Sequence, residues 1–286
     1  MHPNNPHTDN YDLKNLVEKN RALEKYVFTN DFGKKTIDFS INDAVLQLNI
    51  ALLKLHYDIE SYNVPEGYLC PAIPGRVDYL HHISDLLSEV KNNQNIKGLD
   101  IGSGANGIYP ILANKIFSWK MVGCDINKNA VEISSEIIRK NNLSNTIEIR
   151  YQENNANIFE GIIKSDEYFD FTMCNPPFHT SEKEAIAGTM RKLKNLNTFH
   201  KTTELSLNFG GQANELWCNG GEALFIKRMI KQSVAFKDQV GWFTSLVSKK
   251  ENLSKIQKQL DKLKVTQKVV HMTIGNKITR FIAWKF

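Results

Sequence analysis

The chain has 286 residues, of which 41% are hydrophobic and 23% are charged, and its formal net charge is +5. These values are ordinary for a globular protein that buries a sizeable core, as one large domain or as a core domain with a smaller extension. The mild basic excess is compatible with a polyanionic partner, but it is equally typical of charge that only keeps a protein soluble, so composition alone excludes neither class.

The four cysteines, Cys70, Cys124, Cys174 and Cys218, are widely spaced and form no CxxC pair, so the spacing of a metal site is absent. We expect Cys124 and Cys174, which lie in apolar runs, to be reduced and buried. No apolar run approaches the ~20 residues that span a membrane, and the N-terminal residues lack the apolar stretch of a secretory signal. We therefore expect a cytoplasmic protein with no metal and no membrane attachment.

The first part of the chain predicts a helical extension. Residues 1–12 are polar and are expected to form a mobile arm. Over residues 13–57 the apolar side chains recur at helical spacing. The proline- and glycine-containing stretch 64–75 is typical of an irregular connector, and a further helix is predicted over residues 79–90. We assign residues 1–66 to an N-terminal helical extension and residues 67–286 to the main domain.

After Lys97 the chain alternates between strands and helices. Helices are predicted from about residue 107, around residues 130–138, and over 223–233 and 252–263. Seven strand-like runs lie at 98–101, 121–126, 147–151, 169–174, 240–247, 265–272 and 279–286. Strands separated by helical segments of this length imply a mostly parallel sheet with helices on both faces. The last two runs are joined by a short linker and predict a terminal antiparallel hairpin.

A glycine-rich turn lies between the first of these strands and its helix, where residues 100–107 read DIGSGANG. Gly102, Gly104 and Gly107 satisfy GxGxxG, and glycines here let the backbone approach a bound cofactor. Asp125 closes the second strand, where a carboxylate accepts hydrogen bonds from both hydroxyls of a ribose. The ordinary alternative is a tight turn followed by a surface aspartate.

The turn fits two cofactors that contain adenosine, NAD and S-adenosylmethionine. A dehydrogenase would bind a pyrophosphate at the helix N-terminus. Methyltransferases typically carry an acidic residue just before the first glycine, as Asp100 does here. This favours the methyl donor, with Gly102 and Gly104 lining it and Asp125 holding its ribose.

The sequence Asn175-Pro176-Pro177-Phe178 follows the fourth strand, at the edge where open α/β sheets place their active sites. Consecutive prolines cannot continue a strand, so the chain leaves the sheet in a stiff conformation. The N6 amine of adenine is a poor nucleophile, because its lone pair is conjugated into the ring. The side-chain oxygen of Asn175 and the carbonyl of Pro176 are suited to accept its two N–H groups and aim the lone pair at a methyl group. Phe178 would stack on the base, a contact worth about 1–3 kcal/mol.

Over nearly its whole length the chain resembles the bacterial 23S ribosomal RNA adenine-N6 methyltransferases of the large subunit methyltransferase F type, whose eukaryotic relative methylates a spliceosomal small nuclear RNA. The resemblance rests on HPNNPH and YDL (2–13), GYLCPAIPGRVDYLHHISDLL (67–87), DIGSGANGIYP (100–110), CNPPFH (174–179), NFGGQANELWCNGGE (208–222), WFTSLVS (242–248) and RFIAW (280–284). It implies a class I, Rossmann-like methyltransferase fold with S-adenosylmethionine as cofactor.

The resemblance also implies roles for single residues. Arg76 would hold the carboxylate of the donor's methionine, although an arginine that caps the next helix is an equal alternative. Asn154, after the third strand, would contact the donor's adenine, and its alternative is to cap a loop. Residues 175–178 would receive the target base, and the substrate would be 23S ribosomal RNA or an assembly intermediate of the large subunit.

The chain departs from these relatives in its arm, because they are more basic where this chain has Asn5, Pro6 and Asp9. The arm of this chain therefore offers fewer positive charges for electrostatic binding of RNA. The segment 183–201, just beyond the catalytic motif, remains basic. Its candidates for phosphate contacts are Arg191, Lys192, Lys194 and Lys201, and the ordinary alternative is a solvated charged loop.

Other functions fit parts of the same pattern. A DNA adenine-N6 methyltransferase or a protein glutamine-N5 methyltransferase would use the same Asn-Pro-Pro-aromatic geometry on a planar amino group. A non-catalytic RNA-binding module would keep the basic segment without needing an intact donor site. The sequence does not specify the target nucleotide or the oligomeric state.

Overall fold

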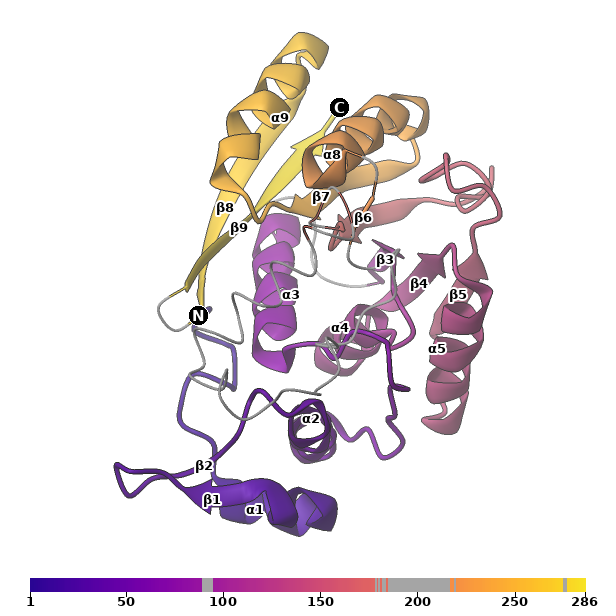
Figure 1. Ribbon diagram of the computed structural model, residues 1–286. Helices are drawn as coiled ribbons and strands as arrows, with labels where there is room; N and C mark the ends of the chain where they lie inside the picture. The colour runs from indigo at the N-terminus through magenta and orange to yellow at the C-terminus, as the bar shows by residue number, and fades with distance from the viewer. Residues whose placement is uncertain are drawn as a thin grey trace.

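The computed structural model describes residues 1–88, 95–177, 220–274 and 277–286, together with residues 179, 181, 184, 217 and 218. Its main element is a seven-stranded sheet with helices on both faces, and a two-stranded sheet lies in the N-terminal part of the chain (Figure 1). The α/β class predicted from the alternating pattern is confirmed.

The large sheet has the strand order β5-β4-β3-β6-β7-β9-β8. Its strands are β3 (Lys97–Ile101), β4 (Lys120–Asp125), β5 (Ile147–Tyr151), β6 (Phe169–Cys174), β7 (Val240–Leu246), β8 (Thr266–Ile274) and β9 (Lys277–Lys285). The strands β3 to β7 pair in parallel, and β9 pairs antiparallel with both β7 and β8. The predicted terminal hairpin is therefore confirmed. All six residues of β6 are buried, as expected for a parallel strand covered on both faces.

Each face of the sheet is covered by its own set of helices (Figure 1). The helices α3 (Ile73–Ser88), α4 (Ile108–Phe117) and α5 (Lys128–Lys140) bury their apolar sides in one core cluster. The helices α8 (Gly221–Ser233) and α9 (Lys250–Leu263) bury theirs in a second cluster, with β3 and the segment 158–163. This layering leaves the ends of the central strands accessible between the two helical layers.

The N-terminal part of the chain consists of α1 (Leu13–Lys19), the 3-10 helix η1 (Arg21–Tyr26), β1 (Val27–Thr29), β2 (Lys35–Ile37) and α2 (Asn42–Tyr57). The prediction of helical structure throughout residues 13–57 is therefore wrong for residues 27–37, which form a short hairpin. Its turn is set by Asn30, whose side-chain oxygen accepts the N–H of Phe32 and of Lys34, and by Gly33 at a φ of 72°.

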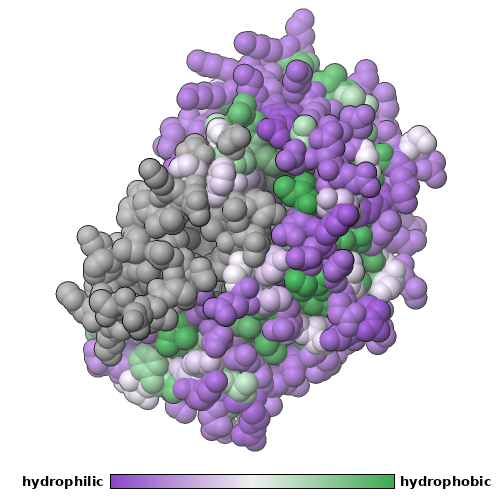
Figure 2. Space-filling model, turned by 45° about the vertical axis from the view of Figure 1, so that its right-hand side comes forward, coloured by the Kyte–Doolittle hydropathy of each residue, from purple (hydrophilic) through white to green (hydrophobic). Residues whose placement is uncertain are grey.

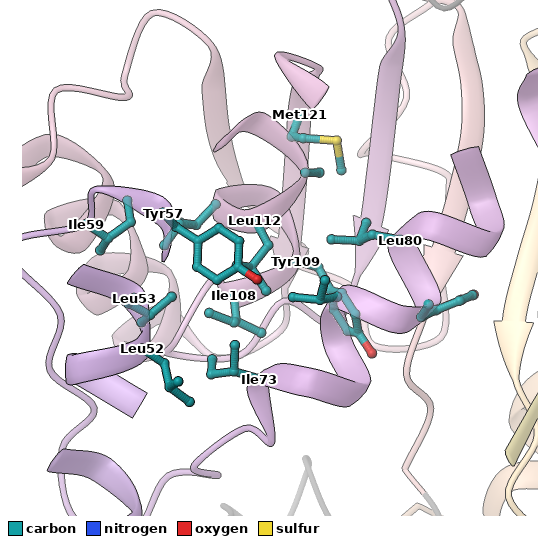
Figure 3. Packing of buried hydrophobic residues seen from close by; sticks show 14 of the residues in the cluster. Leu52, Leu53, Tyr57, Ile59, Ile73, Leu80, Ile108, Tyr109, Leu112 and Met121 are labelled. Carbon is teal, nitrogen blue, oxygen red and sulfur yellow. The ribbon is translucent and has the colours of Figure 1, made fainter. Parts of the chain in front are cut away.

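The extension shares a hydrophobic core with the main domain. Figure 3 shows side chains from α2, α3, α4 and β4 meeting in one cluster, with Leu52 and Leu53 of α2 close to Ile73 and Ile108. Both leucines are almost fully buried. The domain boundary at residue 66 stays a prediction, and the packing indicates that the two parts support one another.

The polar arm is docked on the main domain, contrary to the expectation that it is mobile. The backbone N–H of His2 donates to Asp78 Oδ1 at 2.6 Å, and Asn5 Nδ2 donates to the same oxygen at 3.3 Å. The ring of His7 hydrogen bonds through Nε2 to Tyr57 Oη at 2.7 Å. Asp78 is fully buried in α3, and a buried carboxylate needs donors. The arm supplies them, which is why a polar sequence packs here.

One group of possible metal ligands occurs among the described residues, His2, His82 and Asp85, whose ligand atoms lie within 4.8 Å of one another. His2 Nδ1 accepts the N–H of Asn4 at 3.1 Å, so the ring proton resides on Nε2, which donates to Asp85 Oδ2 at 3.0 Å. The arrangement is that of a hydrogen-bonded anchor for the arm.

The described surface is mainly hydrophilic on the face in Figure 2, with hydrophobic residues in small groups between charged ones. Across the described part of the chain, no helix combines the length and apolar character that crossing a bilayer requires.

Candidate active site

A cavity of about 480 Å³ lies at the carboxyl ends of the central strands. Within the sheet, β4 and β5 follow β3 in one direction, and β6 and β7 follow it in the opposite direction. Such a reversal of strand order opens a crevice for ligands. The cavity is lined by the glycine-rich turn after β3, by the ends of β4 and β6, and by the first turns of α3 and α4.

The glycine-rich turn presents its backbone to the cavity. The N–H groups of Gly102 and Ser103 both donate to the carbonyl of Cys124 at 2.9 Å, which fixes the turn against β4. Gly102 has a φ of 75° and Gly104 a φ of 63°, a region that favours glycine. A Cβ added at Gly102 would meet nothing within 4 Å, so the space in front of it is open. The glycines are thus needed for the turn and leave room for a ligand.

Asp125 lies at the end of β4 and lines the same cavity. Its Oδ2 accepts the N–H of Gly104 and its Oδ1 accepts the N–H of Asn127, both at 2.9 Å. Burial raises the pKa of this carboxyl group, and the backbone hydrogen bonds oppose the rise. Each carboxylate oxygen has two lone pairs, so the group is held in place and still able to accept hydroxyl protons from a ligand.

Arg76 and Tyr109 form a pair on the opposite wall. Arg76 Nη1 donates to Tyr109 Oη at 2.8 Å, and the guanidinium carbon lies 5.2 Å from the centre of the tyrosine ring. Arg76 Nε is buried, and no described residue accepts its proton. The cationic group is therefore oriented and still has an N–H available for an anion.

Asp100 lies at the end of β3 and is fully buried. Neither of its carboxylate oxygens has a hydrogen-bond partner among the described residues. Burial raises the pKa of Asp100 to about 7, although the guanidinium of Arg76 opposes the rise. Asp100 is not itself among the residues that line the cavity, and it lies directly before the glycine-rich turn that does.

The loop after β5 lines the cavity, but Asn154 does not. Asn154 Oδ1 accepts the N–H of Ala156 at 3.0 Å, and the side chain of Asn154 caps this loop. The assignment of the adenine contact to Asn154 gains no support from the structure, because its oxygen is used within the loop and its side chain is not part of the cavity wall. The loop residues that reach the cavity are Gln152 and the segment 155–158.

The loop is held in place by helix α8. Gln232 Oε1 accepts the N–H of Ile158 at 2.7 Å, and Gln232 Nε2 donates to the carbonyl of Ala156 at 2.8 Å. Arg228 Nη1 donates to the carbonyl of Asn155 at 3.2 Å. Arg228 and Phe225 of the same helix also line the cavity. Helix α8 thus fixes the wall that faces the end of β4.

The Asn-Pro-Pro-Phe motif leaves the sheet where it was predicted, directly after β6. Asn175 and Pro177 line the cavity, and Pro176 is buried beside them. Asn175 Oδ1 is buried, and no described residue donates to it. An orphaned acceptor of this kind costs about 1–3 kcal/mol unless a donor reaches it. Phe178 lies outside the described residues.

Of the predicted site residues, Arg76, Gly102, Gly104, Asp125, Asn175 and Pro177 line the same cavity, and Asp100 is buried near the end of β3. The basic candidates Arg191, Lys192, Lys194 and Lys201 lie outside the described residues. The cavity wall also contains residues that the sequence analysis did not single out, among them Tyr109, Gln152, Trp217, Phe225 and Arg228. A tyrosine two residues after the glycine-rich turn gave a local signal, but Trp217, Phe225 and Arg228 approach the cavity from a remote segment.

Comparison with known proteins gives a consistent picture. The chain matches an RNA methyltransferase family over residues 1–286. It is 57% identical to the ribosomal RNA large subunit methyltransferase F of Christiangramia forsetii, with 100% of both chains covered. It is 48% identical to the protein of the same name from Flavobacterium johnsoniae, covering 100% of this chain and 93% of that protein.

Solved structures of human METTL16 have the same fold. The catalytic domain in complex with the MAT2A 3'UTR hairpin 1 has a TM-score of 0.84 at 26% identity, covering 100% of this chain and 95% of that one. The N-terminal domain in complex with SAH has a TM-score of 0.80 at 25% identity, covering 100% of this chain and 98% of that one. The Rossmann-like methyltransferase fold inferred from the sequence is confirmed.

Proposed function

The chain belongs to the RNA methyltransferase family, and on that premise we propose that it transfers a methyl group from S-adenosylmethionine to the N6 amine of an adenine in the 23S ribosomal RNA of the large subunit. The observation that carries the proposal is the orphaned Oδ1 of Asn175, an acceptor at the end of β6 in the same cavity as the glycine-rich turn. The names of the relatives support the substrate class.

Each group of S-adenosylmethionine would have a partner at the donor end of the cavity. Asp125 would hold the ribose hydroxyls, while Gln152 and the segment 155–158 would enclose the adenine. The buried N–H of Arg76 matches the carboxylate of the methionine, and the unpaired carboxyl group of Asp100 matches its ammonium group. When bound, the donor supplies a methyl group on a positively charged sulfur.

The acceptor end would hold the adenine to be methylated. Asn175 Oδ1 and the carbonyl of Pro176 would accept the two N–H groups of N6, which directs the nitrogen lone pair away from the ring and toward the donor. No general base is required in this arrangement, because the amine loses its proton after transfer. The stiffness of Pro176 and Pro177 keeps both acceptors in position.

The RNA would be held outside the cavity. We assign this contact to the N-terminal extension, residues 1–66, and to the basic residues Arg191, Lys192, Lys194 and Lys201. Lysine and arginine side chains contact phosphates without reading sequence, so they would position the RNA while residues 175–178 hold the target adenine. The substrate would be free 23S RNA or a particle in assembly, encountered in the cytoplasm.

The test is a comparison of ribosomal RNA from wild-type and deletion strains by mass spectrometry of nuclease digests. We expect one N6-methyladenine of 23S RNA to disappear in the deletion strain and to return with the wild-type gene but not with Asn175→Ala. An unchanged 23S RNA would refute the assignment. Methylated DNA adenine, or a methylated protein glutamine, lost in the same strain would point to the alternative substrates of this geometry.

A further inference from the structure

Trp217 reaches the cavity from a part of the chain far from the catalytic motif. It forms a parallel bridge with His179, and the N–H of the next residue, Cys218, donates to the carbonyl of His179 at 3.1 Å. His179 lies two residues after Pro177. The backbone therefore ties Trp217 to the segment that follows the catalytic asparagine.

The indole of Trp217 carries an unused donor. Its Nε1 is buried, and no residue in the described part of the chain accepts its proton. Asn175 Oδ1, on the wall of the same cavity, is buried and without a donor. Buried polar groups in native proteins are almost always paired. A donor and an acceptor that line one cavity and have no partner among the described residues point to a ligand that carries the complementary pair.

Adenine carries this pair. Its N6 amine is a donor, and the ring nitrogens N1 and N7 on either side of it are acceptors. We propose that Trp217 is a specificity-determining residue whose indole N–H donates to the ring nitrogen beside the amine that is methylated. This inference rests on the proposed function, and it assigns to Trp217 the recognition of the base rather than of its amine.

The assignment explains how other bases would be rejected. Guanine presents an oxygen toward Asn175 Oδ1 and an N–H at position 1, so an acceptor would meet an acceptor. A site built to donate to a ring nitrogen is left with an unpaired buried N–H when that nitrogen is absent, and such sites discriminate strongly. The discrimination would act at the base and would leave donor binding unchanged.

The experiment uses a synthetic RNA hairpin that contains the mapped target site, with adenine, 1-deazaadenine or 7-deazaadenine at the target. Methyl transfer is measured as kcat/KM for the wild type, Trp217→Phe and Trp242→Phe. The last variant is a matched control, because Trp242 of β7 is also buried, its Nε1 has no acceptor among the described residues, and it does not line the cavity. Calorimetry with S-adenosylmethionine checks that each variant retains its fold and donor site.

For the wild type we expect one of the two deaza substrates to be about tenfold poorer than adenine, the effect of one lost hydrogen bond. Trp217→Phe should lose a similar factor on adenine and should no longer distinguish adenine from that analogue, whereas Trp242→Phe should behave as wild type. Because the comparison uses the same analogue on two enzymes, the change in intrinsic reactivity of the amine cancels.

Two results would overturn the inference. Equal rates of the wild type on all three substrates would do so whether or not the variants fold. The inference would also fail if Trp217→Phe distinguished adenine from the deaza analogue as strongly as the wild type does. If the wild type methylates no adenine in any RNA, the proposed function itself fails and this inference falls with it, an outcome distinct from methylation without discrimination.

Discussion

Asp125 ends β4 and Asn175 directly follows β6, the two strands that flank β3. Their side-chain oxygens differ in hydrogen bonding. Both oxygens of Asp125 accept backbone N–H groups at 2.9 Å. The side-chain oxygen of Asn175 accepts none from the described residues. The two residues lie in one cavity, and burial alone does not explain the contrast.

Under the proposed function, the difference means that the ribose site at Asp125 is formed before any ligand arrives, whereas the base site at Asn175 is completed by the substrate. A preorganised carboxylate holds a ribose without reorganisation and contributes to affinity. The acceptor of Asn175 is paired only when the amine is in place. It should stabilise mainly the transition state, in which the amine changes geometry, and so contribute to the rate. Changes at the two ends should therefore separate into effects on affinity and effects on rate.

The largest effect is expected for Asn175→Ala. Removing one well-placed acceptor from a charge-developing transition state costs about 3 to 4 kcal/mol, which is roughly a 10²–10³-fold loss of rate. The affinity for S-adenosylmethionine should remain within about threefold of the wild-type value, because the side-chain oxygen of Asn175 hydrogen bonds to no described residue of the donor end. Single-turnover methylation of 23S RNA and calorimetry with the donor separate the two quantities.

Asn154→Ala is the matched control for this substitution, since Asn154 is exposed and its oxygen serves only the loop. It should change the rate by less than about threefold. A variant at Asn175 that turned over as fast as this control would rule out the mechanism with two acceptors.

The opposite pattern is expected for Asp125→Ala. Loss of a charged acceptor for hydroxyl groups should weaken donor binding by about 10- to 100-fold. At saturating donor the rate should fall much less, because the group acts equally in the ground state and the transition state. The Kd from calorimetry and kcat at saturation provide the check, with Asp238→Ala as an exposed control. A large fall in kcat with unchanged Kd would reverse the comparison between the two ends.

The third prediction extends the base end to the RNA. Reversing the charges of Arg191, Lys192 and Lys194 together should reduce the slope of log affinity against log salt by about two to three units, since each phosphate contact contributes roughly 0.7 to 0.9. Binding of the free donor should be unchanged. The measurement is RNA binding over a series of salt concentrations. If the loop is solvated and makes no contact with RNA, the variant will show the same slope as the wild type, and the assignment of these residues will be wrong.

Much of this site was accessible from the sequence, because the main features are local. The turn at residues 100–107 and Asp125 follow successive strands, and Asn175 follows a third. The carboxyl ends of parallel strands meet at one edge, so knowing the strands places the residues. The mostly parallel sheet followed from the alternation of strands and helices, and the terminal hairpin followed from the short linker between the last two strands.

What escaped prediction depends on contacts between distant segments. The arm was expected to be mobile because residues 1–12 are polar, but its polar groups pair with the buried Asp78 of α3. Asn154 was placed against the donor because position in a loop does not reveal which side chain the loop itself uses. The residues Trp217 and Arg228 reach the cavity only through tertiary packing, for which the sequence carries no periodic signal.

The smallest expected effect concerns Asp100, which lies on β3 between the two ends compared above. Burial raises its pKa to about 7 from the model-compound value of 3.8, so the carboxyl group is protonated in part at neutral pH. Because the folded-state pKa is the higher one, ionisation of Asp100 destabilises the donor-free protein as the pH rises from about 3.8 to about 7. A bound ammonium group would offset that cost, since it favours the ionised carboxylate.

Donor affinity should therefore increase as the pH rises through 7. Between pH 6 and pH 8 the ionised fraction of a group with a pKa of about 7 grows from about a tenth to about nine tenths, which corresponds to roughly a tenfold change in Kd. Calorimetry with S-adenosylmethionine at pH 6, 7 and 8 measures it. Asp100→Asn should bind S-adenosylmethionine more weakly than the wild type, and its Kd should change with pH only through the titration of the donor's own amine. Subtracting the profile of this variant from that of the wild type leaves the contribution of Asp100. If the wild-type and Asp100→Asn profiles ran parallel, the ammonium group of the donor would not be held by Asp100, and the donor end would be complete without it.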